Sequence, residues 1–348
     1  MTWAPGQKLH RDKYEIKREL GRGRIGITYL ATNRDGKETV IKTLNPDLLN
    51  QLSLEDRNYL ESGLLDEAPK LARCKHPNIV LMIESFKEGD LPCIVMEYIQ
   101  GDNLANIIRT RGFFPEKEAL GYIQQIGQAL IEVHKQGFLH RDIKPENIMV
   151  RAGTYQAVLI DFDLARGFDS PLTSRGARVD GFTPIELYSN STRQQARRGA
   201  WTDIYSLAAT LYVLLTGQQP VSAIDRKDQN KRLAEPKELN NKISDRINNA
   251  IIQGMELEPE QRRQTVEDWL KELGLQTRGF SLPKLLWIKP LWARIIGILT
   301  VLGLLAGIIS GLDATINLRD KLFPKPSATP TNSTTQDTTP SLSLPQKK

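Results

Sequence analysis

Short apolar runs separated by turn residues dominate the chain between about residues 14 and 100. Runs of this length are typical of β-strands. In one instance TYLAT and TVIKTL flank the segment NRDGKE, whose Asp35-Gly36 step is a strong turn signal. The pattern predicts a strand-rich lobe over about residues 14–96 that contains a hairpin through Asp35-Gly36.

Helical periodicity replaces this pattern from Leu104 onward. In FPEKEALGYIQQIGQALIEVHKQG the apolar residues recur at three- and four-residue steps, which places them on one face of a helix. Pro115 suits the first turn of that helix, and Gly137 suits its C-terminal cap. We therefore predict an α+β fold in which a helical lobe, about residues 100–273, follows the strand-rich lobe, with a ligand cleft between the two.

A second kind of apolar segment lies near the C-terminus. Residues 295–312, IIGILTVLGLLAGIISGL, carry no charge, and Trp287 and Trp292 precede them where interfacial aromatics would sit. This segment predicts one transmembrane helix, joined to the lobes by a juxtamembrane linker at 274–294. Residues 313–348 are rich in Pro, Ser and Thr and predict a disordered tail.

Charge and cysteine content exclude several classes of function. The 348-residue chain carries 47 basic and 41 acidic residues, a net charge of +6, without a long basic run, which argues against nucleic-acid binding. Residues 1–13 form an N-terminal extension without the apolar core of a secretory signal peptide. Cys74 and Cys93 show neither metal-ligand spacing nor the dense pattern of a disulfide scaffold, which favours a reduced compartment.

The stretch LGRGRIGITYLAT places Gly21, Gly23 and Gly26 in G-x-G-x-x-G spacing. Glycines at this spacing let backbone N–H groups approach phosphate oxygens, because no Cβ stands in the way. The motif lies between two predicted strands, which argues against a dinucleotide-binding fold, where a helix opens within the motif. By itself the motif also fits a flexible hairpin.

Two charged residues follow the glycine motif. Lys42 stands in the apolar run TVIK, where an ammonium group needs an anion. Glu67, in the helical pattern LLDEAPKLARCKHPNIV, can supply a carboxylate that holds Lys42 against the phosphates of a nucleotide. Taken singly, each residue also fits an ordinary surface charge.

The sharpest cluster is HRDIKPEN, residues 140–147, directly after the long helix. Asp142 can accept the proton of an attacking hydroxyl, Lys144 can neutralise charge on a transferred phosphoryl group, and Asn147 can offer an oxygen to Mg²⁺. Asp161, in VLIDFD, is a second hard oxygen ligand. These residues together indicate phosphoryl transfer.

In this order and spacing the motifs resemble those of the eukaryotic-like serine/threonine protein kinases, in the membrane-anchored layout of many bacterial members, over about residues 14–273. The resemblance implies a bilobal protein kinase fold. It also implies an enzyme that transfers the γ-phosphoryl group of ATP, with Mg²⁺ or Mn²⁺, to Ser and Thr hydroxyls of protein substrates.

The resemblance assigns roles to individual residues. The implied catalytic residues are Asp142, Lys144, Lys42 and Glu67, the last two as an ion pair. The implied metal ligands are Asn147 and Asp161. The implied ATP contacts are Leu20, Gly21, Gly23, Gly26, Thr28, Val40 and Lys42, with the hinge residues Met96, Glu97, Tyr98 and Ile99.

Two further matches concern the helical lobe. GFTPIELY carries Pro-Ile-Glu where the family usually has Ala-Pro-Glu, and its Glu186 is expected to pair with Arg262. Asp203, in WTDIYSLAATLYVLLTG, matches the aspartate that supports the catalytic loop from the central helix. The resemblance therefore extends well beyond the nucleotide motifs.

The sequence also departs from the family pattern at Thr28, where the glycine loop usually carries valine, and at Asp163. Asp163 replaces the glycine of Asp-Phe-Gly. Aspartate tolerates a left-handed backbone better than most residues, and every phosphate and metal ligand is retained, so we expect a working enzyme. The alternative is a pseudokinase that serves as a membrane-anchored scaffold. A small-molecule kinase of related fold is a third interpretation, against which the activation segment from Asp161 to Glu186 argues.

Regulation and location follow from the same chemistry. We expect autophosphorylation within GFDSPLTSRGARVDGFT, first at Thr173 and Ser174 and then at Ser170, because Arg141 can pair with a phosphorylated hydroxyl. ATP and Mg²⁺ are cytosolic, so the kinase domain is expected in the cytoplasm of a single-pass protein of the plasma membrane. Pairing of two copies is left open.

Overall fold

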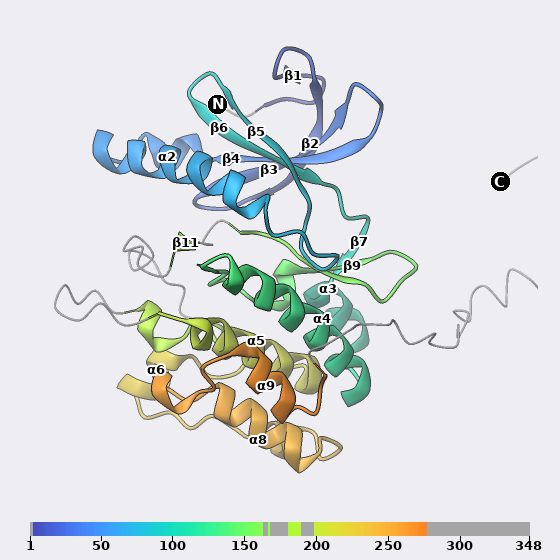
Figure 1. Ribbon diagram of the computed structural model, residues 1–348, viewed down its shortest axis with the longest axis vertical. Coiled ribbons are helices and arrows are strands. Elements are labelled where there is room, and N and C mark those ends of the chain that lie inside the picture. The colour runs from blue at the N-terminus through green and yellow to red at the C-terminus, as the bar shows by residue number, and fades with distance from the viewer. Residues whose placement is uncertain (1–2, 163–165, 168–179, 189–197, 277–348) are drawn as a thin grey trace, which may run out of the picture. The chain divides into compact units, whose positions relative to one another are not determined.

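The computed structural model describes residues 3–162, 166–167, 180–188 and 198–276 (Figure 1). All of them belong to the first of two compact units of the chain, Met1–Gly279. Within this unit a β-rich lobe precedes a helical lobe, as Figure 1 shows from top to bottom. The predicted two-lobed α+β architecture is therefore confirmed.

The first lobe is built on one six-stranded sheet, with strand order β1-β2-β3-β4-β6-β5. Its strands are β1 (Lys8–Leu9), β2 (Tyr14–Arg22), β3 (Gly26–Asn33), β4 (Glu38–Leu44), β5 (Met82–Glu88) and β6 (Leu91–Glu97). All neighbouring pairs are antiparallel. The hairpin predicted through Asp35-Gly36 joins β3 to β4, and Gly36 has φ 78°, a conformation that favours glycine in such turns.

Side-chain alternation along β3 and β4 separates a core face from a cleft face. Ile27, Tyr29 and Ile41 are at most 1% exposed and pack in the core of the lobe. The residues between them point to the other face. There Thr28 stands opposite Lys42, as the strand register shows. The period of two thus places several of the predicted nucleotide-binding residues on one surface.

The N-terminal extension packs on the same sheet. Leu9 in β1 is 1% exposed and pairs with Tyr14 of β2. The ring of Trp3 lies 5.2 Å from that of Tyr29. The described part of the extension, residues 3–13, therefore contributes to the core of the β-rich lobe.

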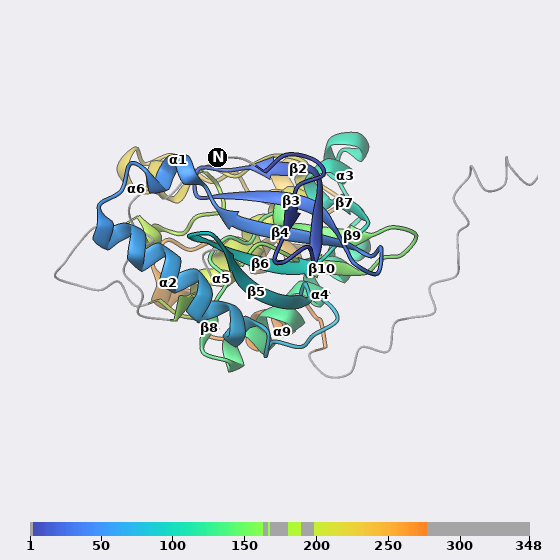
Figure 2. The same cartoon turned by 90° about the horizontal axis from the view of Figure 1, so that it is seen from above.

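Two helices complete the first lobe: α1 (Pro46–Leu49) and α2 (Leu54–Leu71). Helix α2 lies beside β5 and β6 (Figure 2). The segment after α2 joins the two lobes, because the N–H of Val80 donates to the carbonyl oxygen of Leu159 and the N–H of Leu159 donates to that of Asn78.

The second lobe is mainly helical. Its helices are α3 (Leu104–Arg111), α4 (Glu116–Lys135), α5 (Ala200–Thr216), α6 (Ala223–Asp228), α7 (Pro236–Leu239), α8 (Asp245–Gly254) and α9 (Val266–Glu272), with short 3₁₀ turns η1 (Pro145–Asn147), η3 (Ile185–Leu187) and η4 (Pro259–Gln261). Nearly every side chain of α5 is buried, and α4, α7, α8 and α9 pack around this helix. The apolar stripe predicted for α4 is confirmed, since Ile123, Ile126 and Leu130 are fully buried.

Short strands lie between the two lobes. β7 (Gly101–Asn103), β9 (Ile148–Arg151) and β10 (Ala157–Leu159) form one sheet, and β8 (Phe138–Leu139) pairs with β11 (Arg166–Gly167). These strands hold the loop at residues 140–147 and Asp161 at the boundary of the lobes.

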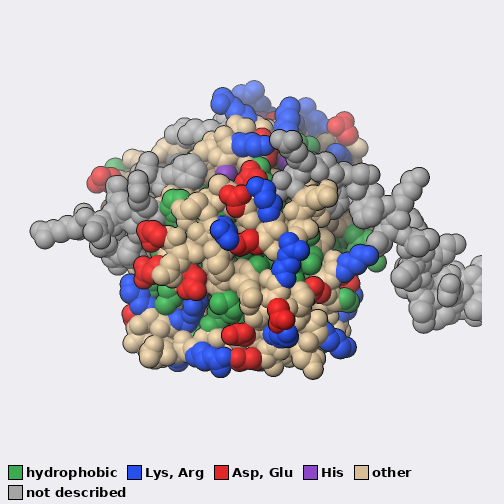
Figure 3. All heavy atoms as spheres, turned by 60° about the horizontal axis from the view of Figure 1, so that its bottom comes forward, with side chains coloured by type: hydrophobic (Ala, Val, Ile, Leu, Met, Phe, Trp, Pro, Cys, Tyr) green, Lys and Arg blue, Asp and Glu red, His purple; other side chains and the backbone are tan. Residues whose placement is uncertain are grey.

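On the face drawn in Figure 3, basic and acidic side chains are interspersed.

None of the helices in the described ranges combines the length and the hydropathy that a membrane crossing requires. The segment 295–312, for which a transmembrane helix was predicted, lies outside those ranges. So do the tail at 313–348 and all but residues 274–276 of the linker.

Candidate active site

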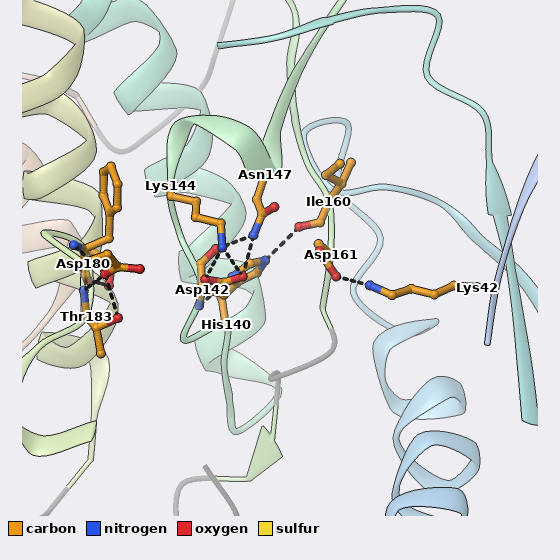
Figure 4. A network of polar contacts seen from close by, with 11 residues as sticks. Lys42, His140, Asp142, Lys144, Asn147, Ile160, Asp161, Asp180 and Thr183 are labelled. Carbon is orange, nitrogen blue, oxygen red and sulfur yellow. Dashed lines mark hydrogen bonds and ion pairs between the residues drawn. The ribbon is translucent and has the colours of Figure 1, made fainter. Parts of the chain in front are cut away.

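The loop between β8 and β9 presents the carboxylate of Asp142. Lys144 Nζ lies 2.7 Å from each of its oxygens, and Asn147 Nδ2 donates to Asp142 Oδ2 at 2.9 Å and to the Asp142 carbonyl oxygen at 2.7 Å (Figure 4). The side chain of Asp142 keeps 26% of its surface exposed. Three predicted residues therefore converge, and two of them orient a carboxylate that solvent and substrate can reach.

Asp203 of α5 holds the main chain of this loop, as predicted. Its carboxylate is fully buried and accepts the main-chain N–H groups of His140 and Arg141 at 2.9 and 2.8 Å. His134 Nε2 lies 2.7 Å from the same carboxylate. Burial by itself would raise the pKa of Asp203, but the interactions with His134, His140 and the N–H of Arg141 together lower that pKa. Asp203 also holds Arg141 at φ 66°, a costly conformation for a non-glycine residue.

His140 connects the loop to the strand that leads to Asp161. Its buried ring places Nε2 3.1 Å from the carbonyl oxygen of Ile160 and Nδ1 3.3 Å from the N–H of Asp142. Burial lowers the pKa of His140, which favours the neutral ring. A neutral ring that donates from Nε2 and accepts at Nδ1 satisfies both contacts. The ring also packs edge-on against Phe162, with centroids 4.6 Å apart.

Lys42 and Asp161 form an ion pair across the two lobes (Figure 4). The side chain of Lys42 is only 12% exposed, whereas that of Asp161 is 33% exposed. Glu67, the predicted partner of Lys42, lies on α2, and its side chain is outside the described part of the structure. The predicted lysine and one predicted metal ligand are thus brought together.

The donor set suits a hard cation. Asp161 offers a carboxylate and Asn147 an amide oxygen, and oxygen ligands of this kind are what Mg²⁺ prefers. Among the described residues no three His, Cys, Asp or Glu side chains gather that could hold a metal by themselves. A cation at Asp161 and Asn147 would take its remaining ligands from phosphate oxygens and water, which is the usual arrangement for Mg²⁺ at a nucleotide.

The glycine motif forms the turn between β2 and β3. A Cβ on Gly21 would meet no atom within 4 Å, and one on Gly23 would meet only the Gly26 carbonyl oxygen at 3.5 Å. A Cβ on Gly26 would lie 3.0 Å from the carbonyl oxygen of Thr43 and 3.4 Å from Lys42 Cε. A side chain at Gly26 would therefore crowd β4. Packing within the fold does not require glycine at Gly21 or Gly23, and the missing side chains there leave room for a ligand.

The predicted adenine contacts surround the connection between the lobes. Val40 of β4 stands opposite Met96 of β6, and Met96 packs against a buried apolar group that contains Ile99. The carboxylate of Glu97 accepts Arg151 Nη2 at 2.7 Å and the N–H of Leu81 at 3.0 Å. The side chain of Glu97 is thus hydrogen-bonded within the protein, and its main-chain N–H also donates to the carbonyl oxygen of Leu81 at 2.9 Å.

The other predicted contacts lie nearby on the same elements. Leu20 stands near the end of β2 and is 37% exposed. Thr28 lies on the cleft face of β3, and Tyr98 directly follows β6 and is half-buried. The predicted nucleotide residues therefore come from β2, β3 and the turn between them, from β4 and β6, and from the segment after β6.

The predicted pair of Glu186 and Arg262 is present and fully buried. The side chains are 2% and 0% exposed, and Arg262 Nη1 and Nη2 donate to the two carboxylate oxygens at 2.8 and 3.1 Å. The remaining donors of Arg262 go to main-chain carbonyl oxygens of Trp201, Leu257 and Glu256. This pair fixes η3 against the segment that follows α8.

Some residues of the site were missed by sequence reasoning. His134 contacts Asp203, and nothing in the helical period of α4 marked it. Asp180 Oδ1 accepts the N–H of Phe182 and both the N–H and hydroxyl of Thr183, at 2.9 to 3.0 Å (Figure 4). The step Asp-Gly-Phe-Thr is a turn signal that could have indicated this contact. Asp163, Ser170, Thr173 and Ser174 lie outside the described residues.

The glycine turn, the Lys42–Asp161 ion pair and the oriented carboxylate of Asp142 lie in the arrangement expected of a two-lobed phosphotransferase that uses a nucleotide. The chain belongs to the protein kinase family: the family model described as protein kinase domain matches residues 14–273. This match confirms the family predicted from the motifs.

Known relatives and structures agree with this family. The serine/threonine-protein kinase PknB of Mycobacterium leprae is 32% identical over 273 residues, which is 75% of this chain and 42% of that protein. The crystal structure of the PknI kinase domain of Mycobacterium tuberculosis superimposes with a TM-score of 0.60 at 20% identity, covering 79% of this chain and 100% of that one. A crystal structure of Rad53 residues 1–466 in complex with AMP-PNP gives a TM-score of 0.61 at 21% identity, covering 76% and 65%.

The chain spans 38%, 26% and 42% of the lengths of three curated kinases that it matches, from Clostridium perfringens, Myxococcus xanthus and Mycobacterium leprae. The similarity thus concerns the kinase domain. The two solved structures, both below 25% identity, support the fold.

Proposed function

We propose that this chain is a serine/threonine protein kinase that transfers the γ-phosphoryl group of ATP to Ser and Thr hydroxyls of proteins. The observation that carries the proposal is the carboxylate of Asp142 held by Lys144 and Asn147, with Lys42 and Asp161 paired across the lobes. The relatives in Mycobacterium leprae and Bacillus subtilis are named serine/threonine-protein kinases. The Rad53 structure, which contains AMP-PNP, supports ATP as the donor.

Each residue has a defined task in this proposal. Asp142 orients the acceptor hydroxyl and takes its proton, because its carboxylate is the exposed acceptor of the loop. Lys144, which lies 2.7 Å from both Asp142 oxygens, supplies positive charge beside the transferred group. Lys42 holds phosphate oxygens, and the main-chain N–H groups around Gly21 and Gly23 cradle them.

The metal has a separate task. Mg²⁺ or Mn²⁺, when bound with ATP, neutralises charge that develops on the phosphates. Asp161 and Asn147 are the residues that would hold it. Asp161 pairs with Lys42 in the structure. With nucleotide bound, Asp161 would contact the cation and Lys42 would contact the phosphate oxygens.

Incubation of the full-length chain with radiolabelled Mg-ATP and a generic basic protein tests the proposal. We expect both proteins to be labelled, and we expect peptide mapping to find phosphate on Ser or Thr within residues 164–183 of the chain. Arg141, beside Asp142, is the residue that would pair with such a phosphate. No label on either protein would refute the kinase, whereas phosphosites only outside 164–183 would refute the proposed autophosphorylation.

A pseudokinase scaffold is the second candidate, because Asp163 replaces a glycine. We expect Asp163→Gly to change the initial rate at saturating Mg-ATP by about tenfold or less. A non-glycine residue in a sparsely populated backbone region costs about 1 kcal/mol, and 1.4 kcal/mol corresponds to about tenfold. Asp163 is not one of the predicted metal ligands, so its replacement leaves Asp161 and Asn147 in place. An inactive parent that Asp163→Gly switches on would make the pseudokinase the better account.

Anchoring in a membrane is the last part of the proposal. Its support is the uncharged sequence 295–312 with Trp287 and Trp292 before it. The kinase domain faces the cytoplasm, where ATP is found. We expect the full-length chain to stay in the membrane fraction after a carbonate wash at high pH, and a chain ending at residue 279 to be released. Release of both would contradict the anchor.

A further inference from the structure

Asn45 is buried beside the glycine turn. It follows β4 directly, three positions after Lys42, and is 7% exposed. It is also the N-cap of α1, where its side chain accepts the N–H of Asp47 at 3.1 Å. Asn45 therefore lies between the strand that carries Lys42 and a short helix that begins with Pro46.

Two hydrogen bonds join Asn45 to the glycine turn. Its side-chain Nδ2 donates to the carbonyl oxygen of Gly23 at 3.0 Å, and its main-chain N–H donates to the carbonyl oxygen of Ile25 at 2.7 Å. The turn is closed within itself, because the N–H of Gly23 donates to the carbonyl oxygen of Gly26 at 2.9 Å. Asn45 thus holds the glycine turn at two positions, Gly23 and Ile25.

The orientation of the Asn45 amide is fixed by its partners. Its oxygen faces an N–H group, that of Asp47, and its nitrogen faces a carbonyl group, that of Gly23. The reverse orientation would place like groups against each other at both ends. Main-chain bonds from Leu48 and Leu49 to the Asn45 carbonyl oxygen, both 3.1 Å, hold the residue further. Asn45 is therefore held by α1 on one side and by the glycine turn on the other.

This contact sets the direction of a peptide plane. The peptide bond between Gly23 and Arg24 is planar and trans, so its C=O and N–H point in opposite directions. Fixing the Gly23 carbonyl oxygen on Asn45 therefore also fixes the direction of the Arg24 N–H, which points the opposite way within the same plane. A loop that binds phosphate through main-chain N–H groups depends on such directions.

We propose that Asn45 is a positioning residue that holds the glycine turn in the shape that binds the phosphates of ATP. The proposal rests on the proposed function, since it concerns the same nucleotide. Without the bond to Gly23 the turn keeps its glycines but samples more conformations, and binding phosphate then includes the cost of ordering it. Asn45 bonds to the glycine turn and to α1, and none of these partners is a predicted hinge residue, so we expect its effect at the phosphate end of the nucleotide.

Asn45→Ser separates this role from helix capping. Serine is a good N-cap, carries no charge, and is too short to donate to Gly23 from the cap position. In the full-length chain we expect the Kd for Mg-AMP-PNP to rise about fivefold, the loss of one net hydrogen bond of about 1 kcal/mol. The Kd for adenosine, which has no phosphates, is expected to stay within about twofold of the parent value, as is the KM for a protein substrate. Calorimetry measures both dissociation constants, and initial rates measure KM.

Two more variants keep the test decisive. Asn45→Asp also retains the capping oxygen but turns a carboxylate oxygen toward the Gly23 carbonyl oxygen, and we expect a larger rise in the Kd for Mg-AMP-PNP. Thr265→Ala removes the N-cap of α9, where Thr265 accepts the N–H of Asp268 at 3.2 Å, and should lower the thermal midpoint without changing either Kd.

Equal Kd values for Mg-AMP-PNP in Asn45→Ser and the parent would overturn the positioning role. Equal rises for adenosine and Mg-AMP-PNP would also overturn it, because a general loss of lobe structure would then explain the effect. A parent that binds no Mg-AMP-PNP at all would instead refute the proposed kinase function, so the two failures are distinguishable.

Discussion

Asp142→Asn is expected to lower the initial rate of protein phosphorylation by about a thousandfold or more, with the thermal midpoint nearly unchanged. A positioned general base contributes about 10² to 10⁴ in rate, and an amide cannot take the proton of the acceptor hydroxyl. The geometry adds a second effect. Lys144 Nζ is 2.7 Å from both oxygens of Asp142, and an amide offers only one oxygen, so one of these contacts is lost whichever way the amide turns.

The matched control for this variant is Asp268→Asn. The exposed carboxylate of Asp268 also accepts a hydrogen bond from a lysine, since Lys271 Nζ lies 2.8 Å from Asp268 Oδ1. Asp268 lies on α9, in the second lobe. We expect its rate to equal that of the parent within about twofold. The Kd of Asp142→Asn for Mg-AMP-PNP should also stay within about threefold of the parent value, because the proposed partner of Asp142 is the acceptor hydroxyl and not the nucleotide. Near-normal turnover in Asp142→Asn would show that another residue is the catalytic carboxylate.

Local signals in the sequence were sufficient for the parts of the site that lie on one short segment. Asp142, Lys144 and Asn147 fall within six residues, and Pro145 starts the 3₁₀ turn that brings Asn147 back to the Asp142 carboxylate. The same holds for the hairpin at Asp35-Gly36, where the turn residues and the flanking apolar runs agree. Such features are decided by neighbours in sequence.

Contacts between distant segments were predicted where the family pattern supplied them. Glu186 and Arg262 are 76 residues apart, and Asp203 reaches the N–H of His140 over 63 residues. No propensity or periodicity links such positions. The resemblance to protein kinases did so, and the described geometry confirms both contacts.

The remaining contacts depend on how the lobes and strands are placed. Lys42 and Asp161 are 119 residues apart and meet only because β4 and the strand β10 are brought to the same boundary. The contact of Asn45 with Gly23 depends on the pairing of β3 with β4, which places Leu44 opposite Gly26, and on the path of the turn that carries Gly23. Alternation of apolar residues does not encode the path of such a turn. Sequence reasoning therefore missed Asn45 as the residue that holds the glycine turn.

Arg262→Ala is expected to lower the free energy of unfolding of the kinase domain by about 3 to 5 kcal/mol, the usual cost of removing one partner of a buried ion pair. Glu186 would keep a charged side chain that is 2% exposed, with the hydroxyl of Thr202, at 3.0 Å, still donating to it. The three carbonyl oxygens that Arg262 now satisfies would also lose a donor.

Arg263→Ala is the matched control for this loss of stability. Arg263 is the next residue and pairs with Glu272 at the surface, where both side chains are partly exposed and an ion pair contributes about 0 to 1 kcal/mol. In a domain of this size about 1 kcal/mol shifts the thermal midpoint by about 2 °C or slightly more, so we expect a drop of roughly 6 to 15 °C for Arg262→Ala against about 2 °C for Arg263→Ala. The double variant Glu186→Leu with Arg262→Met should recover part of the drop, since no unpaired charge remains buried. Equal midpoints for the two arginine variants would mean that the buried pair does not stabilise the fold.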